Sequence, residues 1–90
     1  MTYEYQTTLT GAEVIARAKA FFAERVPLTA AYPEKEGPGY LVLRGQGGEE
    51  VVISVRAADG ATGIRASTLL FDQAVSRFLS TLPVPVKVPA

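Results

Sequence analysis

The segment Glu50–Ala57 constrains the fold of this chain more than any other part of the sequence. It contains three valines and an isoleucine, and β-branched residues favour strands. Side chains alternate along a strand, so one face carries Val51, Ile53, Val55 and Ala57, and the other carries Val52, Ser54, Arg56 and Ala58. The main chain of a strand needs neighbours with which to pair, so this segment predicts a β-sheet.

Glycine and proline divide the neighbouring sequence into further segments of strand length. Gly37-Pro38-Gly39 predicts a turn, Gly45–Gly48 a hairpin loop, and Asp59-Gly60 a two-residue hairpin turn. Near the N-terminus, polar and larger side chains alternate from Thr2 to Leu9, which is typical of a strand. The predicted strands are 2–9, 28–32 (ended by Pro33), 40–44, 50–57 and 62–68.

Two segments have apolar residues at helical spacing. Thr10-Gly11-Ala12-Glu13 matches a capping box, so a helix is predicted from there to about Arg25, before Pro27. A second helix is predicted from about Thr68 to Thr81. The expected buried residues are Val14, Ile15, Ala18, Phe21 and Phe22 in the first helix, and Phe71, Ala74, Val75, Phe78 and Leu82 in the second.

The resulting order is strand, helix, four strands, helix. Short connections favour antiparallel pairing of neighbouring strands, and each helix has one apolar stripe to bury. We therefore expect an α+β two-layer sandwich, with an antiparallel sheet and both helices on one face. Residues 1–82 form the single predicted domain. Residues 83–90 form an extended tail, because Pro83, Pro85 and Pro89 exclude a helix while Val84, Val86 and Val88 share one side.

The residue types exclude several classes of function. The chain has no histidine and no cysteine, which excludes Ser-His-Asp and Cys-His catalytic arrangements and ordinary zinc, haem or iron–sulfur sites. Lys+Arg and Asp+Glu each number nine, so the net charge is zero. A neutral chain is not expected to bind nucleic acid or an anionic membrane surface, both of which attract basic proteins.

Neither a membrane span nor a signal peptide is expected. No apolar run reaches the roughly 18–20 residues that cross a bilayer. The N-terminal segment MTYEYQTTLT is polar and lacks the basic and apolar regions of a signal peptide. We therefore expect a cytoplasmic protein.

Two polar features predict exposed turns rather than ligand sites. Glu34 with Glu36, and Glu49 with Glu50, are acidic pairs without the spacing of a calcium loop, so they read as solvated charges. The loop Gly45–Gly48 lacks the lysine and the Ser or Thr of a phosphate loop and leads into a strand. No metal and no cofactor are predicted.

Two groups of residues on the sheet face away from the helices are candidate sites. Arg44, Arg56 and Arg65 lie in consecutive predicted strands and, with Tyr40, Ser54 and Ser67, are a possible anion site. The alternative is a solvated outer face with scattered charges. Val42 and Val52 on the same face, with the tail residues Val84, Val86 and Val88, are a possible interface. The alternative is that these valines reflect strand propensity alone.

Four phenylalanines offer a further candidate site. Phe21, Phe22, Phe71 and Phe78 can line a pocket for a small apolar ligand between sheet and helices. The competing hypothesis is that they fill the core, because a domain of this size has little core volume to spare.

The order of elements resembles that of TATA-binding-protein-like domains and of the helix-grip proteins of the START and polyketide-cyclase superfamily. The segment Gly60–Leu82 (GATGIRASTLLFDQAVSRFLSTL) carries the likeness, as a last strand followed by a helix with spaced Phe and Leu. The helix-grip resemblance implies a carrier of an apolar ligand held between sheet and helices.

A non-catalytic binding or interaction domain that forms homo-oligomers fits these features best. Its expected partners are a second copy or another protein, because a neutral chain has little charge repulsion and the valine-rich tail can add to a sheet edge. The alternatives are the apolar-ligand carrier, and an enzyme that works with Arg, Tyr and carboxylate groups alone.

Overall fold

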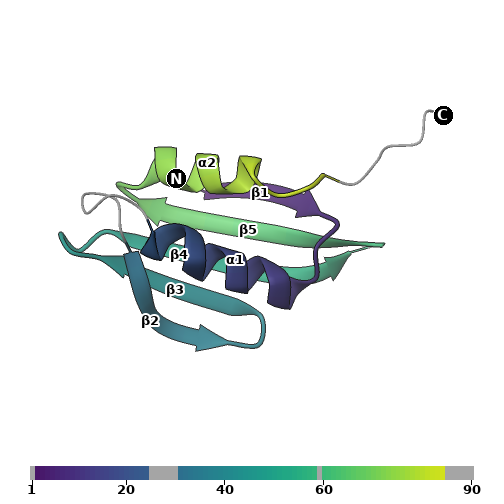
Figure 1. Cartoon of the computed structure of the whole chain (residues 1–90), viewed down its shortest axis with the longest axis horizontal. Coiled ribbons are helices and arrows are strands. Elements are labelled where there is room, and N and C mark those ends of the chain that lie inside the picture. Colours follow the sequence, from purple (N-terminus) through teal and green to yellow (C-terminus); the bar gives the residue numbers. More distant parts are fainter. Residues whose placement is uncertain (1, 25–30, 59, 85–90) are drawn as a thin grey trace.

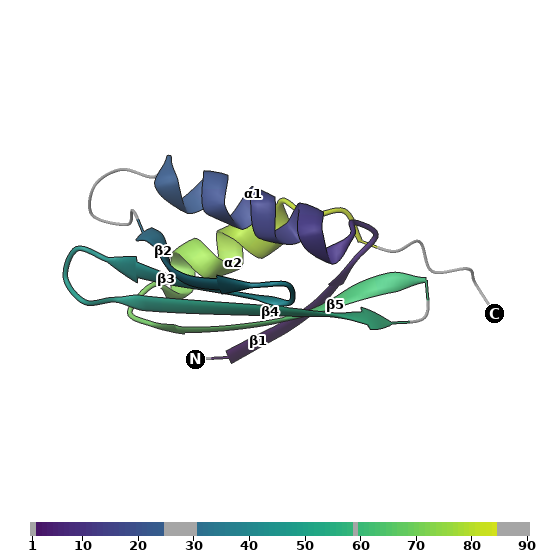
Figure 2. The same cartoon turned by 90° about the horizontal axis from the view of Figure 1, so that it is seen from below.

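Five strands and two helices form the structure, which is a computed structural model describing residues 2–24, 31–58 and 60–84. Figure 1 shows them in the order β1 (Thr2–Thr7), α1 (Gly11–Ala23), β2 (Ala31–Gly37), β3 (Tyr40–Gly45), β4 (Glu50–Ala58), β5 (Ala61–Leu69) and α2 (Asp72–Ser80). The strands form one antiparallel sheet in the spatial order β1-β5-β4-β3-β2. Both helices lie on the same face of this sheet (Figure 2), which confirms the predicted α+β class and element order.

The core lies between the helices and the sheet. Alternate residues of the central strands are buried on this face, among them Leu41, Leu43, Val51, Ile53 and Ile64. The helices contribute their predicted stripes, of which only Phe21 is half-buried rather than buried. Burial of one stripe per helix against one sheet face therefore accounts for the two-layer arrangement.

Three phenylalanine rings join the two helices. In α1 the ring centroids of Phe21 and Phe22 lie 5.2 Å apart. Phe78 of α2 lies 5.4 Å from Phe21 and 6.0 Å from Phe22. Tilted ring pairs at these distances add to the stabilisation that comes from burial alone.

The start of α1 matches the predicted capping box. The Thr10 hydroxyl accepts a hydrogen bond from the Glu13 backbone N–H at 3.2 Å, and the Glu13 carboxylate accepts one from the Thr10 backbone N–H at 2.9 Å. The hydrogen bonds from Thr10 lower the pKa of Glu13, because they favour its charged form. The helix ends at Ala23, and the predicted end near Arg25 lies outside the described residues.

The first strand ends at Thr7 rather than Leu9, and two other predicted boundaries differ by four or more residues. The strand expected to end at Pro33 continues as β2 to Gly37, with a shift in register between Pro33 and Lys35. Proline is tolerated there because β2 is an edge strand, where one side of the main chain needs no partner. The predicted residues Leu28–Ala30 lie outside the described part of the chain.

The other large difference is the start of α2, which begins at Asp72 rather than near Thr68. Strand β5 continues to Leu69, and the Thr68 hydroxyl donates to the Glu50 carbonyl of β4 at 2.8 Å. Leu70 then turns the chain with a positive φ of 79°, which leucine rarely adopts and the sequence therefore does not suggest.

Truncation of Phe78 should remove much of the stability of the fold. Phe78 is fully buried in the ring cluster, so Phe78→Ala should lower the free energy of unfolding by about 3–5 kcal/mol. The exposed Ser76 in the same helix provides a control, since Ser76→Ala should change it by less than about 0.5 kcal/mol. Thermal and urea unfolding of both variants measures the difference, and equal stability of the two would contradict the role of this ring.

Candidate functional site

The sheet face away from the helices, called the open face below, carries a mixture of apolar and polar side chains. Val42 and Val52 are paired directly across β3 and β4, and both are half-buried. Tyr40 pairs with Ser54 in the next row and is 42% exposed. Ser67 pairs with Val52 from β5. The predicted interface valines of the sheet are therefore neighbours, but the residues around them are largely polar.

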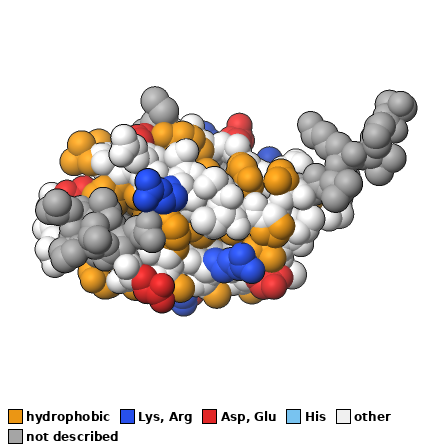
Figure 3. All heavy atoms as spheres, turned by 45° about the horizontal axis from the view of Figure 1, so that its top comes forward, with side chains coloured by type: hydrophobic (Ala, Val, Ile, Leu, Met, Phe, Trp, Pro, Cys, Tyr) orange, Lys and Arg blue, Asp and Glu red, His pale blue; other side chains and the backbone are white. Residues whose placement is uncertain are grey.

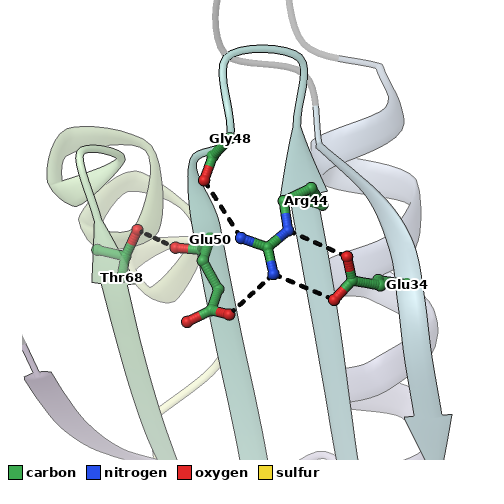
Figure 4. A network of polar contacts seen from close by, with 5 residues as sticks. All are labelled: Glu34, Arg44, Gly48, Glu50 and Thr68. Atoms are coloured by element: carbon green, nitrogen blue, oxygen red, sulfur yellow. Dashed lines mark hydrogen bonds and ion pairs between the residues drawn. The ribbon is translucent and has the colours of Figure 1, made fainter.

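Arg44 forms a network with two carboxylates near one end of this face (Figure 4). Its guanidinium donates two hydrogen bonds to Glu34, each at 3.1 Å, and one to Glu50 at 3.2 Å. A further bond goes to the Gly48 carbonyl at 3.3 Å. The Arg44 guanidinium lowers the pKa of Glu34, and Glu34 raises the pKa of Arg44. These contacts use the donors that the predicted anion site requires from Arg44.

The three predicted arginines do not lie together. Arg44 pairs with Glu50, whereas Arg65 pairs with Ser54, so their rows are offset by four residues, or about 13 Å, along β4. Arg56 pairs with Gly63, two residues from Arg65 on the same face. Its guanidinium carbon lies 3.3 Å from where a Cβ on Gly63 would be, so the side chain lies across that glycine. Arg56 and Arg65 are the two of the three that the fold makes neighbours.

The four predicted ligand-contacting phenylalanines lie in or beside the core. Phe22 and Phe78 are fully buried and in contact with the ring of Phe21. Phe71 is 6% exposed and lies beneath Gly45. Ring-to-ring packing of this kind fills space between helices and sheet, which favours the core hypothesis over the pocket.

The two edges of the sheet differ in their protection against pairing with another chain. Edge strand β2 contains Pro33, an irregular register and the charged run Glu34–Glu36. Proline, bulges and charge are the devices that keep edge strands from pairing further. Edge strand β1 has no proline, a continuous register with β5 and a single charge, at Glu4. The edge of β1 is therefore the unprotected one.

The hydrogen-bond pattern shows which residues of β1 point outward. The N–H of Val55 donates to Gly39 at 2.9 Å, and that of Gly45 donates to Glu49 at 2.9 Å, so odd-numbered residues of β4 face β3. Opposed residues of antiparallel strands alternate between bonded and non-bonded pairs. The uninterrupted registers from β4 to β5 and from β5 to β1 carry this alternation across the sheet.

The alternation directs odd-numbered residues of β1 toward β5 and even-numbered residues outward. Thr2, Glu4 and Gln6 thus direct both N–H and C=O away from the sheet, where no described strand pairs with them. Just after β1, the Thr8 N–H donates to the Pro83 carbonyl at 3.3 Å rather than to a residue of β5. This outer side of β1, the β1 edge, is the candidate functional site.

The sequence did not single out the β1 edge. It predicts the strand but not its place at the end of the sheet, because that place depends on pairing with β5, some sixty residues later. The proline and charges of β2 were visible in the sequence, and their absence from β1 was the one available signal.

Other kinds of site find little support among the described residues. No group of three or more acidic side chains lies close enough to hold a metal ion. Within the same residues, neither helix has the length and apolar character needed to cross a membrane. On the side of the molecule seen in Figure 3, hydrophobic side chains lie among isolated charged groups, and charges of one sign do not cluster.

Comparison with known proteins adds nothing to these observations. The chain matches no protein-family model and is not significantly similar to any curated protein. The resemblance to TATA-binding-protein-like and helix-grip domains therefore remains one of element order.

The Arg44–Glu34 pair should make stability depend on pH. The pKa of Glu34 is lowered from its ordinary 4.5 in the folded state, so the pair stabilises the protein above about pH 4.5. This contribution is lost as the pH falls through the lower, folded-state value. The difference in melting temperature between wild type and Glu34→Gln should be small at neutral pH, because both groups are exposed, and should shrink below pH 4.5. A difference that stays constant down to pH 3 would contradict the pairing.

Proposed function

We propose that this chain is a non-catalytic interaction domain that self-associates by accepting an added strand at the β1 edge. The observation that carries the proposal is the contrast between the two edges of the sheet. The β2 edge has a proline, a register shift and three consecutive charges, whereas the β1 edge has none of these.

An added strand would satisfy main-chain groups that the fold leaves open. Every second residue of β1 directs an N–H and a C=O outward, and these groups are positioned as a template for another chain. Main-chain bonds supply the affinity in this mode of recognition, and each contributes about 0.5–1.5 kcal/mol. A strand of six residues therefore provides several such bonds without a deep pocket or a charged patch.

A second copy of the chain is the partner that the charge favours. The net charge is zero, so two copies approach each other with little repulsion. The one charge on β1, Glu4, has its side chain on the open face rather than in the plane of strand addition. Charge therefore opposes pairing at this edge much less than at β2.

A proline at position 4 tests the proposal. Glu4 directs its N–H outward, so Glu4→Pro should spare the β1–β5 hydrogen bonds and remove a donor from the β1 edge. Wild type should be dimeric at high micromolar concentration, and Glu4→Pro should be largely monomeric, as measured by size-exclusion chromatography with light scattering. Circular dichroism checks that the variant is folded.

Glu36→Pro is the matched control. It also replaces an acidic residue by proline on the outer side of an edge strand, but on β2, where Glu36 lies in a non-bonded pair with Leu41. Its loss of the exposed ion pair with Lys19 should matter little. Glu36→Pro should remain dimeric. A monomeric wild type, or equal association of the two folded variants, would refute the proposal.

A further inference from the structure

Helix α2 delivers the C-terminal segment to the end of β1. Asp72 at its start accepts a hydrogen bond from the Tyr3 hydroxyl at 3.1 Å. After its end, the Leu82 carbonyl lies 3.5 Å from the Tyr5 hydroxyl, and the Pro83 carbonyl accepts from the Thr7 hydroxyl at 2.6 Å. The helix therefore runs alongside β1 in the same direction, and the chain leaves it where β1 ends.

At that point the chain already touches the end of β1. The Pro83 carbonyl accepts a bond from the N–H of Thr8, the residue that follows β1. Seven residues of the chain follow, Val84–Ala90. The segment therefore begins beside the end of β1.

The prolines of this segment all fall on one side of an extended chain. In a strand, the N–H and C=O of one residue point to the same side, and the next residue points to the opposite side. Pro83, Pro85 and Pro89 occupy odd positions, whereas Val84, Val86 and Val88 occupy even positions. In an extended segment, the main-chain groups of the valines point to one edge, called the valine side, and those of the prolines point to the other, called the proline side. The valine side has a complete row of donors and acceptors, whereas Lys87 supplies the one N–H of the proline side.

This alternation opposes pairing of the segment with the β1 edge of its own copy. The Thr8–Pro83 bond sets a register in which Pro85 would meet Gln6 and Pro89 would meet Thr2. Two of the three outward residues of β1 would then face a proline without an N–H, and only Lys87, opposite Glu4, would have one to donate. The chain would also have to reverse direction directly after Pro83.

We infer that the valine side of this segment adds to the β1 edge of a second copy. This inference rests on the proposed function and names the strand that the edge accepts. The even-numbered residues of the segment then face the outward, even-numbered residues of β1 in the other copy. These are Val84, Val86 and Val88 on the segment, and Thr2, Glu4 and Gln6 on β1. If each copy adds its segment to the other, the result is a closed two-fold dimer in which the β1 edges of both copies are covered.

The prolines then have a second role, because they lie on the new outer edge. The added strand has few free N–H groups to offer a third chain, which is how proline protects edge strands elsewhere. The segment also carries one charge, Lys87, opposite in sign to Glu4 of β1. Addition of this strand therefore ends the growth of the sheet rather than continuing it.

Neighbouring proline substitutions test the inference. Val86→Pro removes an N–H from the pairing side, whereas Lys87→Pro removes one from the outer side. Both add one proline to the segment and leave the residues of the hydrophobic core unchanged. Sedimentation equilibrium should show the dimer dissociation constant raised about tenfold or more for Val86→Pro, and changed less than about threefold for Lys87→Pro.

Mixing two variants provides a second measurement. Glu4→Pro has a blocked edge and an intact segment, and Val86→Pro has the reverse. Each should be largely monomeric alone, and native mass spectrometry of the mixture should show a heterodimer joined by one exchanged strand.

The outcomes separate the inference from the proposed function. If Val86→Pro and Lys87→Pro associate like wild type while Glu4→Pro does not, the edge takes another occupant and only the inference fails. Equal weakening by the two segment variants, or no heterodimer in the mixture, also overturns the inference. A monomeric wild type overturns both.

Discussion

The structure depends on the contact between the two helices above the sheet, where Phe21 and Phe22 of α1 meet Phe78 of α2. The helices lie far apart in the sequence and join different strands, and this ring cluster links them within the layer that covers the sheet. A chain of 90 residues buries a limited area on folding and has no disulfide. Its apolar sheet face is covered only while both helices stay in place.

This arrangement decides which surfaces remain for function. With both helices on one face, the sheet retains an open face and two edge strands (Figures 1 and 2). The open face holds Val42 and Val52 among polar neighbours, and the Arg44 network occupies one end of it. The β2 edge is protected by proline and charge. The β1 edge is left with outward main-chain groups, and the segment after α2 starts beside it.

Part of this candidate site could be predicted from the sequence. The valine–proline alternation of residues 83–90 and its suitability for strand addition are visible without a structure. The β1 edge, which accepts the segment in our proposal, could not be predicted. It depends on the place of β1 in the sheet and on which residues of β4, β5 and β1 form hydrogen-bonded pairs. The three-arginine grouping shows the same limit: the strands were predicted, but Arg44 lies four residues along β4 from the row of Arg65.

The sequence by itself determined the features that arise from near neighbours. Alternation identified the strands, helical spacing identified the buried stripes, and Thr10 with Glu13 marked the start of α1, because these signals act within a few residues. Tertiary structure alone decided that β1 pairs with β5, that Pro33 lies within a strand, and that Leu70 turns the chain before α2. Each of these depends on partners distant in the chain: an edge position tolerates the proline, and the Thr68–Glu50 bond keeps β5 extended to the turn. Local propensity is weaker than such contacts, and so the boundaries and the free edge appear only in the folded chain.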